Sequence, residues 1–265
     1  DQKLRSALAT INPEIPADVI DEVYRKVSTS ATPDLFEDNQ LFHNMLVNGV
    51  DVEYAKEDGR ITGDKVWLID FDKLENNSFY AVNQFTVVEN RQNRRPDIVV
   101  FVNGLPLAIV ELKNAVNENT TNHHAYNQLQ TYKKDIPSLF RTNEVLVISD
   151  GIEARVGSLT ANKERFMPWR TIDGVAIAPK GSAELETLLK GLFDRQVFLD
   201  FIRNFIVFET DAQRIVKKIA AYHQYHAVNK AVECTIDASG EEGDKRAGVI
   251  WHTQGSGKSL SMAFY

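Results

Sequence analysis

The sequence predicts an α/β fold in which a mixed sheet flanked by helices is followed by a helical segment. Residues 16–49 carry apolar side chains at helical spacing, whereas residues 65–110 contain short apolar runs that are typical of strands. A further helix-like segment and two strand-like runs come next, and this order is typical of an α/β core. From about residue 179 the pattern becomes mostly helical.

The individual elements follow from local patterns. Two helices are expected at residues 16–27 and 34–49, the second ending at Gly49 as its C-cap, and a polar stretch follows at 51–64. A third helix is expected at 120–136, where Pro137 ends it. Strands are expected at residues 65–71, 79–89, 98–102, 105–110, 144–150 and 153–159.

The last third of the chain presents a different order. Helices are expected over most of residues 182–193, 195–209 and 212–236. A loop of turn residues and charge at 238–245 then leads into an apolar strand at 247–251, a Gly-rich turn and the start of a helix.

Composition narrows the class of protein. The chain has 265 residues, 43% of them hydrophobic and 25% charged, which is ordinary for a globular protein. One cysteine excludes an intrachain disulfide and a cysteine-based zinc site. No apolar run approaches the ~20 residues of a membrane span, and the N-terminus lacks a signal-peptide pattern, so we expect a cytoplasmic protein.

The net charge of −7 does not by itself indicate a nucleic-acid-binding protein. Phosphate contact, however, requires only a local positive patch. Basic residues do cluster locally, and such clusters are often only solvated surface. They are Arg91, Arg94 and Arg95, then Lys133 and Lys134, and later Arg155, Lys163, Arg165 and Arg170.

The stretch from Arg94 to Asn114 predicts a hairpin that turns at Asn103-Gly104 and carries charge at its base. These charged residues are Asp97, Glu111 and Lys113. Glu111 and Lys113 share a face of their strand because side chains alternate. A two-residue loop places Asp97 opposite Val110, on the other face. A three-residue loop, or a bulge with Gly104 left-handed, makes Asp97 and Glu111 direct partners, and we predict that they are partners.

Two neighbouring carboxylates repel each other unless a cation lies between them. Mg²⁺ suits such a pair, since it takes one or two carboxylates and fills its other positions with water and phosphate oxygens. The backbone carbonyl beside Glu111 adds a ligand, and the Lys113 ammonium is placed to orient an attacking water. This set of groups is suited to the hydrolysis of a phosphodiester.

The pattern Pro96-Asp97, an apolar hairpin and Glu111-x-Lys113 resembles the PD-(D/E)xK nuclease superfamily. The resemblance implies that Asp97 and Glu111 bind the metal, that Lys113 is the catalytic lysine and that the core has the restriction-endonuclease-like fold. Gln128 and Tyr132 lie four residues apart on one helical face and are similar to the QxxxY motif of the RecB-like branch, in which they position the site and the DNA.

A second pattern, "HTQGSGKS", follows the expected strand and opens a helix, as a phosphate-binding loop does. Backbone amides of Gly255, Ser256 and Gly257 would hold the ATP phosphates, Lys258 would reach the β- and γ-phosphates, and Ser259 would help to hold Mg²⁺. His252 stands where the general pattern has glycine, a change that is frequent in superfamily 2 helicases and translocases. Gln224 resembles the glutamine that senses adenine in that family.

Together these patterns resemble the N-terminal part of the R subunit of type I restriction enzymes. The resemblance implies residues 1–178 as the endonuclease domain, and residues 179–265 as a helical linker with the first strand and loop of a RecA-like motor. It further implies an ATP-dependent endonuclease that translocates and cleaves double-stranded DNA beside modification and specificity subunits. A RecB-like repair nuclease fused to a helicase, and a DNA-binding or docking module without cleavage, remain as alternatives.

Overall fold

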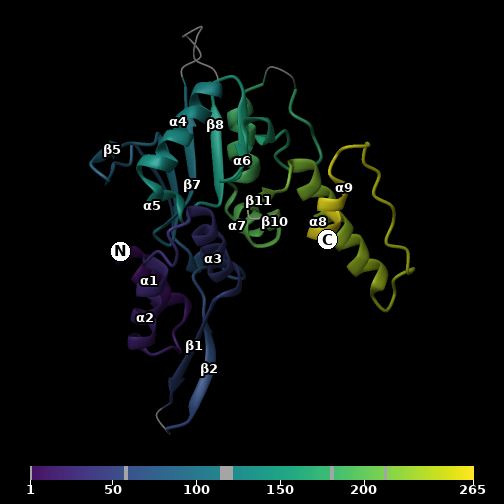
Figure 1. Ribbon diagram of the computed structural model, residues 1–265. Helices are drawn as coiled ribbons and strands as arrows, with labels where there is room; N and C mark the ends of the chain where they lie inside the picture. The colour runs from purple at the N-terminus through teal and green to yellow at the C-terminus, as the bar shows by residue number, and fades with distance from the viewer. Residues whose placement is uncertain (1, 57–58, 114–121, 180–181, 212–213) are drawn as a thin grey trace.

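The computed structural model describes residues 2–56, 59–113, 122–179, 182–211 and 214–265. It is a mixed α/β structure, as the sequence predicts. Its central sheet has five strands in the order β3-β6-β7-β8-β9, in which β7 and β8 run parallel and the other neighbours run antiparallel (Figure 1). Helices lie against both faces of this sheet.

The strands of the central sheet are β3 (Phe79–Asn83), β6 (Ile98–Val102), β7 (Leu105–Leu112), β8 (Val145–Ser149) and β9 (Ala154–Gly157). Three separate hairpins are formed by β1 (Val50–Ala55) with β2 (Ile61–Val66), β4 (Val87–Glu89) with β5 (Gln92–Arg94), and β10 (Ile206–Asp211) with β11 (Arg214–Ile219). The helices are α1 (Gln2–Ile11), α2 (Ala17–Ser28), α3 (Leu35–Asn48), α4 (Asn122–Asp135), α5 (Pro137–Phe140), α6 (Glu184–Leu192), α7 (Arg195–Asn204), α8 (Tyr222–Ser239) and α9 (Lys258–Phe264), with short 3₁₀ helices η1 (Leu74–Asn76) and η2 (Lys163–Arg165).

The strand β7 shows how the sheet is covered. Val110 belongs to the larger hydrophobic cluster, which contains residues of α1–α3 and α6–α8, whereas Ile109 belongs to the cluster on the side of α4 and α5. Because both faces are covered, β7 is an almost continuous apolar run and does not alternate with polar residues. Glu111 lies two residues after Ile109 on the same strand, so its side chain points to the same face, the α4 side.

Several N-terminal predictions are corrected by the structure. The helix α1 was not predicted. Most of the polar stretch 51–64 forms the β1–β2 hairpin, whose side chains are exposed or half-buried along most of its length. The expected strand at 65–71 stops at Val66, because the backbone of Trp67 pairs with the Asn12 side chain and not with a strand. The Asp70 side chain then accepts the amides of Asp72 and Lys73 in a turn. The expected strand at 79–89 is two strands, separated at Gln84, whose φ is 52°.

The expected helix at 120–136 is α4, although its first two residues lie outside the described ranges. Residues 180–181, where the sequence changes character, are outside them too. Further on, residues 206–209 and 214–219, predicted to be helical, lie in the strands β10 and β11 of a hairpin. Ile206 pairs with Ile219, and both are buried. β-Branched residues at 206, 207, 215, 216 and 219 favour strand over helix.

The expected strand at 247–251 is not formed. Val249 and Trp251 are 92% and 90% exposed, and no strand within the described ranges pairs with this segment. An apolar run becomes a strand only where a neighbour satisfies its backbone. The following helix is present as α9.

One hydrophobic cluster crosses the predicted domain boundary at 178/179. It joins Leu107 and Val145 of the sheet to Leu188, Phe201 and Tyr225 of the C-terminal segment. The boundary therefore stays a prediction. None of the helices in the described ranges is long and apolar enough to cross a membrane.

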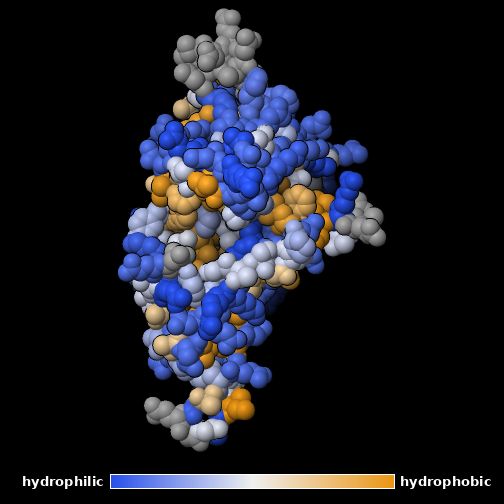
Figure 2. All heavy atoms as spheres, turned by 60° about the vertical axis from the view of Figure 1, so that its left-hand side comes forward, coloured by the Kyte–Doolittle hydropathy of each residue, from blue (hydrophilic) through white to orange (hydrophobic). Residues whose placement is uncertain are grey.

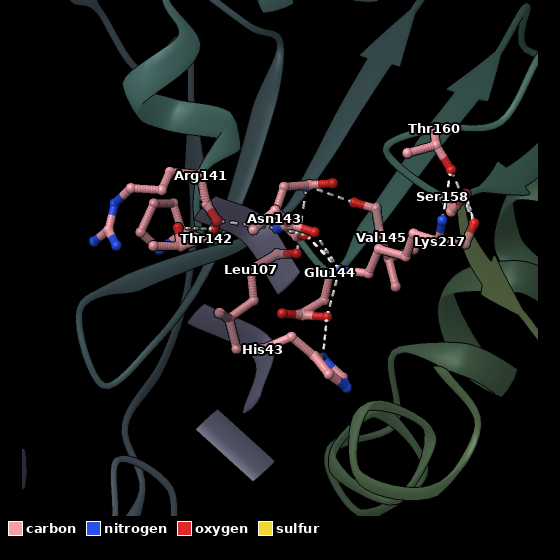
Figure 3. A network of polar contacts seen from close by, with 12 residues as sticks. His43, Leu107, Arg141, Thr142, Asn143, Glu144, Val145, Ser158, Thr160 and Lys217 are labelled. Carbon is pink, nitrogen blue, oxygen red and sulfur yellow. Dashed lines mark hydrogen bonds and ion pairs between the residues drawn. The ribbon is translucent and has the colours of Figure 1, made fainter. Parts of the chain in front are cut away.

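A buried polar cluster also fastens the β10–β11 hairpin to the sheet. Lys217 donates to Glu144 at 2.6 Å and His43 contacts the same carboxylate oxygen at 2.8 Å, so both converge on Glu144 (Figure 3). Lys217 and Glu144 are fully buried. Burial opposes the charged carboxylate, but Lys217 and His43 outweigh it and lower the pKa of Glu144.

Candidate active site

The hairpin of β6 and β7 brings the two predicted metal-binding carboxylates together. The turn has two residues, since Val102 pairs with Leu105, and Asn103 and Gly104 both have positive φ, at 53° and 83°. This is the backbone that an Asn-Gly hairpin favours.

A bulge sets the register of this hairpin. Val100 pairs with Ala108, but Phe101 pairs with Pro106, so Leu107 is the extra residue. Ile98 pairs with Val110, and Asp97 is consequently in line with Glu111. The predicted partnership of the two carboxylates is confirmed. The bulge lies within β7, however, and not at the turn, which keeps its two residues.

The Asp97 carboxylate is held on both sides. Its Oδ1 accepts a hydrogen bond from Gln84 Nε2 at 2.8 Å, and its Oδ2 accepts one from the backbone amide of Leu112 at 2.8 Å. The backbone amide of Gln84 also donates to the backbone carbonyl of Asp97. Gln84 is thus a supporting residue that sequence patterns alone did not reveal.

The Glu111 side chain is almost fully buried, with 1% of its surface exposed. Its Oε1 accepts from Lys113 Nζ at 2.7 Å, whereas its Oε2 has no hydrogen-bond partner among the described residues. Burial raises the pKa of Glu111 from its usual 4.5 to about 7; the hydrogen bond from Lys113 opposes this shift and the charge of Asp97 adds to it.

A chain of hydrogen bonds continues from Lys113 to α4. Lys113 Nζ donates to Gln128 Oε1, and Gln128 Nε2 donates to the Tyr132 hydroxyl. Tyr132 is buried, and this burial raises the pKa of its hydroxyl. The structure therefore brings all five residues of the first predicted site together, with α4 presenting Gln128 and Tyr132 to the end of β7.

Asp97, Lys113, Gln128 and Tyr132 line a groove of about 740 Å³, whereas Glu111 is buried and is not among its lining residues. One wall is the β4–β5 hairpin with the residues after it, and the other is α4. In Figure 2 the side on which β5 projects is turned forward, and its upper half is mostly hydrophilic. The lining side chains are those of Gln84, Asn93, Arg94, Arg95, Asp97, Lys113, His124, Asn127, Gln128, Thr131 and Tyr132.

The donor set formed by Asp97 and Glu111 fits Mg²⁺. Among the described residues there is no cluster of three or more His, Cys, Asp or Glu side chains that would enclose a metal on its own. A pair of carboxylates with one unpaired buried oxygen, Glu111 Oε2, is the smaller set that Mg²⁺ takes when water and phosphate supply its other ligands.

The predicted nucleotide residues gather around the Gly-rich turn. Gly255 and Gly257 have φ of 81° and 80°, and Lys258 donates to the carbonyls of His252 and Thr253 at 3.2 and 3.1 Å. Gln224 donates to the carbonyl of Gly257 at 3.0 Å. A cavity of about 480 Å³ opens beside Gln224, Gly255, Ser256 and Gly257; Lys258 and Ser259 are not among its lining residues.

Comparison with known proteins places these two regions. A family model described as "Type I restriction enzyme R protein N terminus" matches residues 1–165, which contain the whole carboxylate site. A model of the SWI2/SNF2 ATPase matches residues 223–265, which contain Gln224 and the Gly-rich turn. The chain belongs to the type I restriction enzyme R protein family.

Relatives of this R protein come from distant organisms. It is 46% identical over its full length to the type I restriction enzyme HindI endonuclease subunit of Haemophilus influenzae. It is 38% identical over 98% of its length to the putative MjaIXP endonuclease subunit of Methanocaldococcus jannaschii, and 30% identical over 90% to the SauCOLORF180P endonuclease subunit of Staphylococcus aureus. The chain spans about a quarter of these relatives, 25–26% of each.

Proposed function

We propose that this chain is the Mg²⁺-dependent endonuclease part of an ATP-dependent type I R subunit that translocates and cleaves double-stranded DNA. The observation that carries the proposal is the register of β6 and β7, which aligns Asp97 with Glu111 and leaves Lys113 on the same side. Homology to named endonuclease subunits supports it.

Each residue of the site has a role in this proposal. Asp97 and Glu111 hold Mg²⁺, which when bound supplies a Lewis acid for the scissile phosphate. Lys113 orients the attacking water and stabilises negative charge that develops on the phosphate. Gln128 and Tyr132 keep the Lys113 ammonium in place through their chain of hydrogen bonds.

The C-terminal residues belong to a second activity. Gly255, Ser256, Gly257, Lys258 and Ser259 bind the phosphates of ATP and its Mg²⁺, and Gln224 contacts the base, which the match to an ATPase model supports. In this proposal residues 1–178 are the restriction-endonuclease-like domain and residues 179–265 lead into a RecA-like motor. The complete subunit acts in the cytoplasm with modification and specificity subunits.

Substitution in the complete enzyme tests the nuclease site. Asp97→Ala, Glu111→Ala and Lys113→Ala are each expected to lower DNA cleavage at least about a hundredfold, since each removes a group that stabilises the transition state. DNA-dependent ATP hydrolysis is expected to stay within about twofold of wild type. The exposed Glu186→Ala, on α6, is the control. Cleavage by all three variants at the wild-type rate would contradict the proposal.

A further inference from the structure

The β4–β5 hairpin forms one wall of the groove that Asp97 and Lys113 line. It turns at Asn90-Arg91, both with positive φ, at 50° and 61°, and it projects from the edge of the sheet (Figure 1). A hairpin of only three residue pairs does not hold its own position in water, so its place depends on contacts with the rest of the molecule.

Two polar contacts attach this hairpin to the helices α4 and α5. Arg94 forms an ion pair with Asp135 at the end of α4, at 2.7 Å. Glu89 accepts hydrogen bonds from the hydroxyl and the amide of Ser138 at 2.6 and 3.2 Å, at the start of α5. The contacts lie at both ends of the hairpin and fix it as a wall that faces α4.

Arg95 is the cation of this wall that these contacts leave available. It lines the groove and is exposed, and among the described residues it has no hydrogen-bond or ion-pair partner. The charge of Arg94 is engaged by Asp135, and Lys113 is engaged by Glu111 and Gln128. Arg95 is two residues from Asp97, and two residues of chain span at most about 7 Å.

The electrostatics of the groove call for such a cation. The chain carries a net charge of −7, and the lining of the groove includes the Asp97 carboxylate, which repels a phosphodiester that enters the groove. A metal ion compensates at the scissile phosphate only. The neighbouring phosphate requires a positive group of its own, and a guanidinium suits it because it donates two parallel hydrogen bonds to phosphate oxygens.

We propose that this groove holds one strand of the DNA and that Arg95 is a positioning residue, which binds the phosphate next to the one that is cleaved. The polar side chains of α4 that line the facing wall, Asn127 and Thr131 among them, contact the same strand. This inference rests on the proposed nuclease function and adds to it the path of the substrate.

The test uses the complete R subunit assembled with its partner subunits, and follows DNA cleavage and ATP hydrolysis across a series of salt concentrations. Arg95→Ala is expected to slow cleavage about tenfold at physiological salt and less at low salt, since one charge-assisted phosphate contact is lost. ATP hydrolysis is expected to stay at the wild-type rate. Arg95→Lys is expected to recover part of the cleavage, because it keeps the charge but not the two parallel hydrogen bonds.

Arg91→Ala is the matched control. It removes the same charge from the hairpin that precedes Arg95, but Arg91 lies at the turn and does not line the groove. Arg95→Ala with the same cleavage rate as Arg91→Ala, or an Arg95→Lys variant that cleaves no faster than Arg95→Ala, would overturn the inference. Asp97→Ala in the same assay keeps the two proposals apart: if it still cleaves, the nuclease site itself is wrong, whatever Arg95 does.

Discussion

At the scale of the residue, Glu111 links the proposed metal site to the stability of the fold. Its carboxyl is buried with one unpaired oxygen, and its pKa rises from 4.5 in the unfolded chain to about 7 in the folded one. A folded state with the higher pKa binds the proton more tightly. The contribution of Glu111 to the free energy of unfolding is therefore complete below pH 4.5. It is lost as the pH rises through 7, a change of up to about 3 kcal/mol.

Glu111→Gln is expected to remove this loss. Relative to wild type, the free energy of unfolding of the variant should increase by about 2–3 kcal/mol between pH 4.5 and pH 8. Urea unfolding at the two pH values measures it, with Glu75→Gln on the exposed η1 as the control. Mg²⁺ at pH 8 should stabilise wild type and not Glu111→Gln, since the ion binds the ionised carboxylate. Equal pH dependence of wild type and Glu111→Gln would contradict this account.

At the scale of the element, the β10–β11 hairpin is held to the sheet by a buried charge. Removing the Lys217 ammonium leaves Glu144 in the interior with only His43 beside it. Lys217→Met is expected to lower the free energy of unfolding by about 3–5 kcal/mol, as measured by urea denaturation. Lys218→Met, next along the strand but half-exposed and paired with Glu209, should change it by less than about 1 kcal/mol. Similar effects of both would refute a special role for Lys217.

Elements were predictable where their own residues decide them. The pair Asn103-Gly104, with apolar arms on either side, was sufficient for the β6–β7 hairpin, and the charged base located the site. The β10–β11 hairpin was missed although its β-branched residues favour strand, and its attachment to the sheet rests on Lys217 reaching Glu144, 73 positions away, a contact that no local pattern contains. The strand expected at 247–251 is not formed for a related reason, because a strand requires a neighbouring strand to pair with its backbone. The position of the bulge at Leu107 was likewise not encoded in the turn that suggested it.

At the scale of the whole molecule, two predicted sites occupy separate parts of one chain, residues 97–132 and 224–259, and they are separable by substitution. Lys258 donates to two carbonyls of its own loop, which the phosphates of ATP would replace as its partners. In the complete enzyme, Lys258→Ala is expected to lower ATP hydrolysis by roughly a hundredfold or more, with cleavage lost as a consequence. Asp97→Ala should show the reverse, with cleavage lost and ATP hydrolysis kept. Parallel measurement of both activities in both variants checks this: ATP hydrolysis that survives Lys258→Ala would remove the phosphate-loop assignment and leave the nuclease assignment untouched.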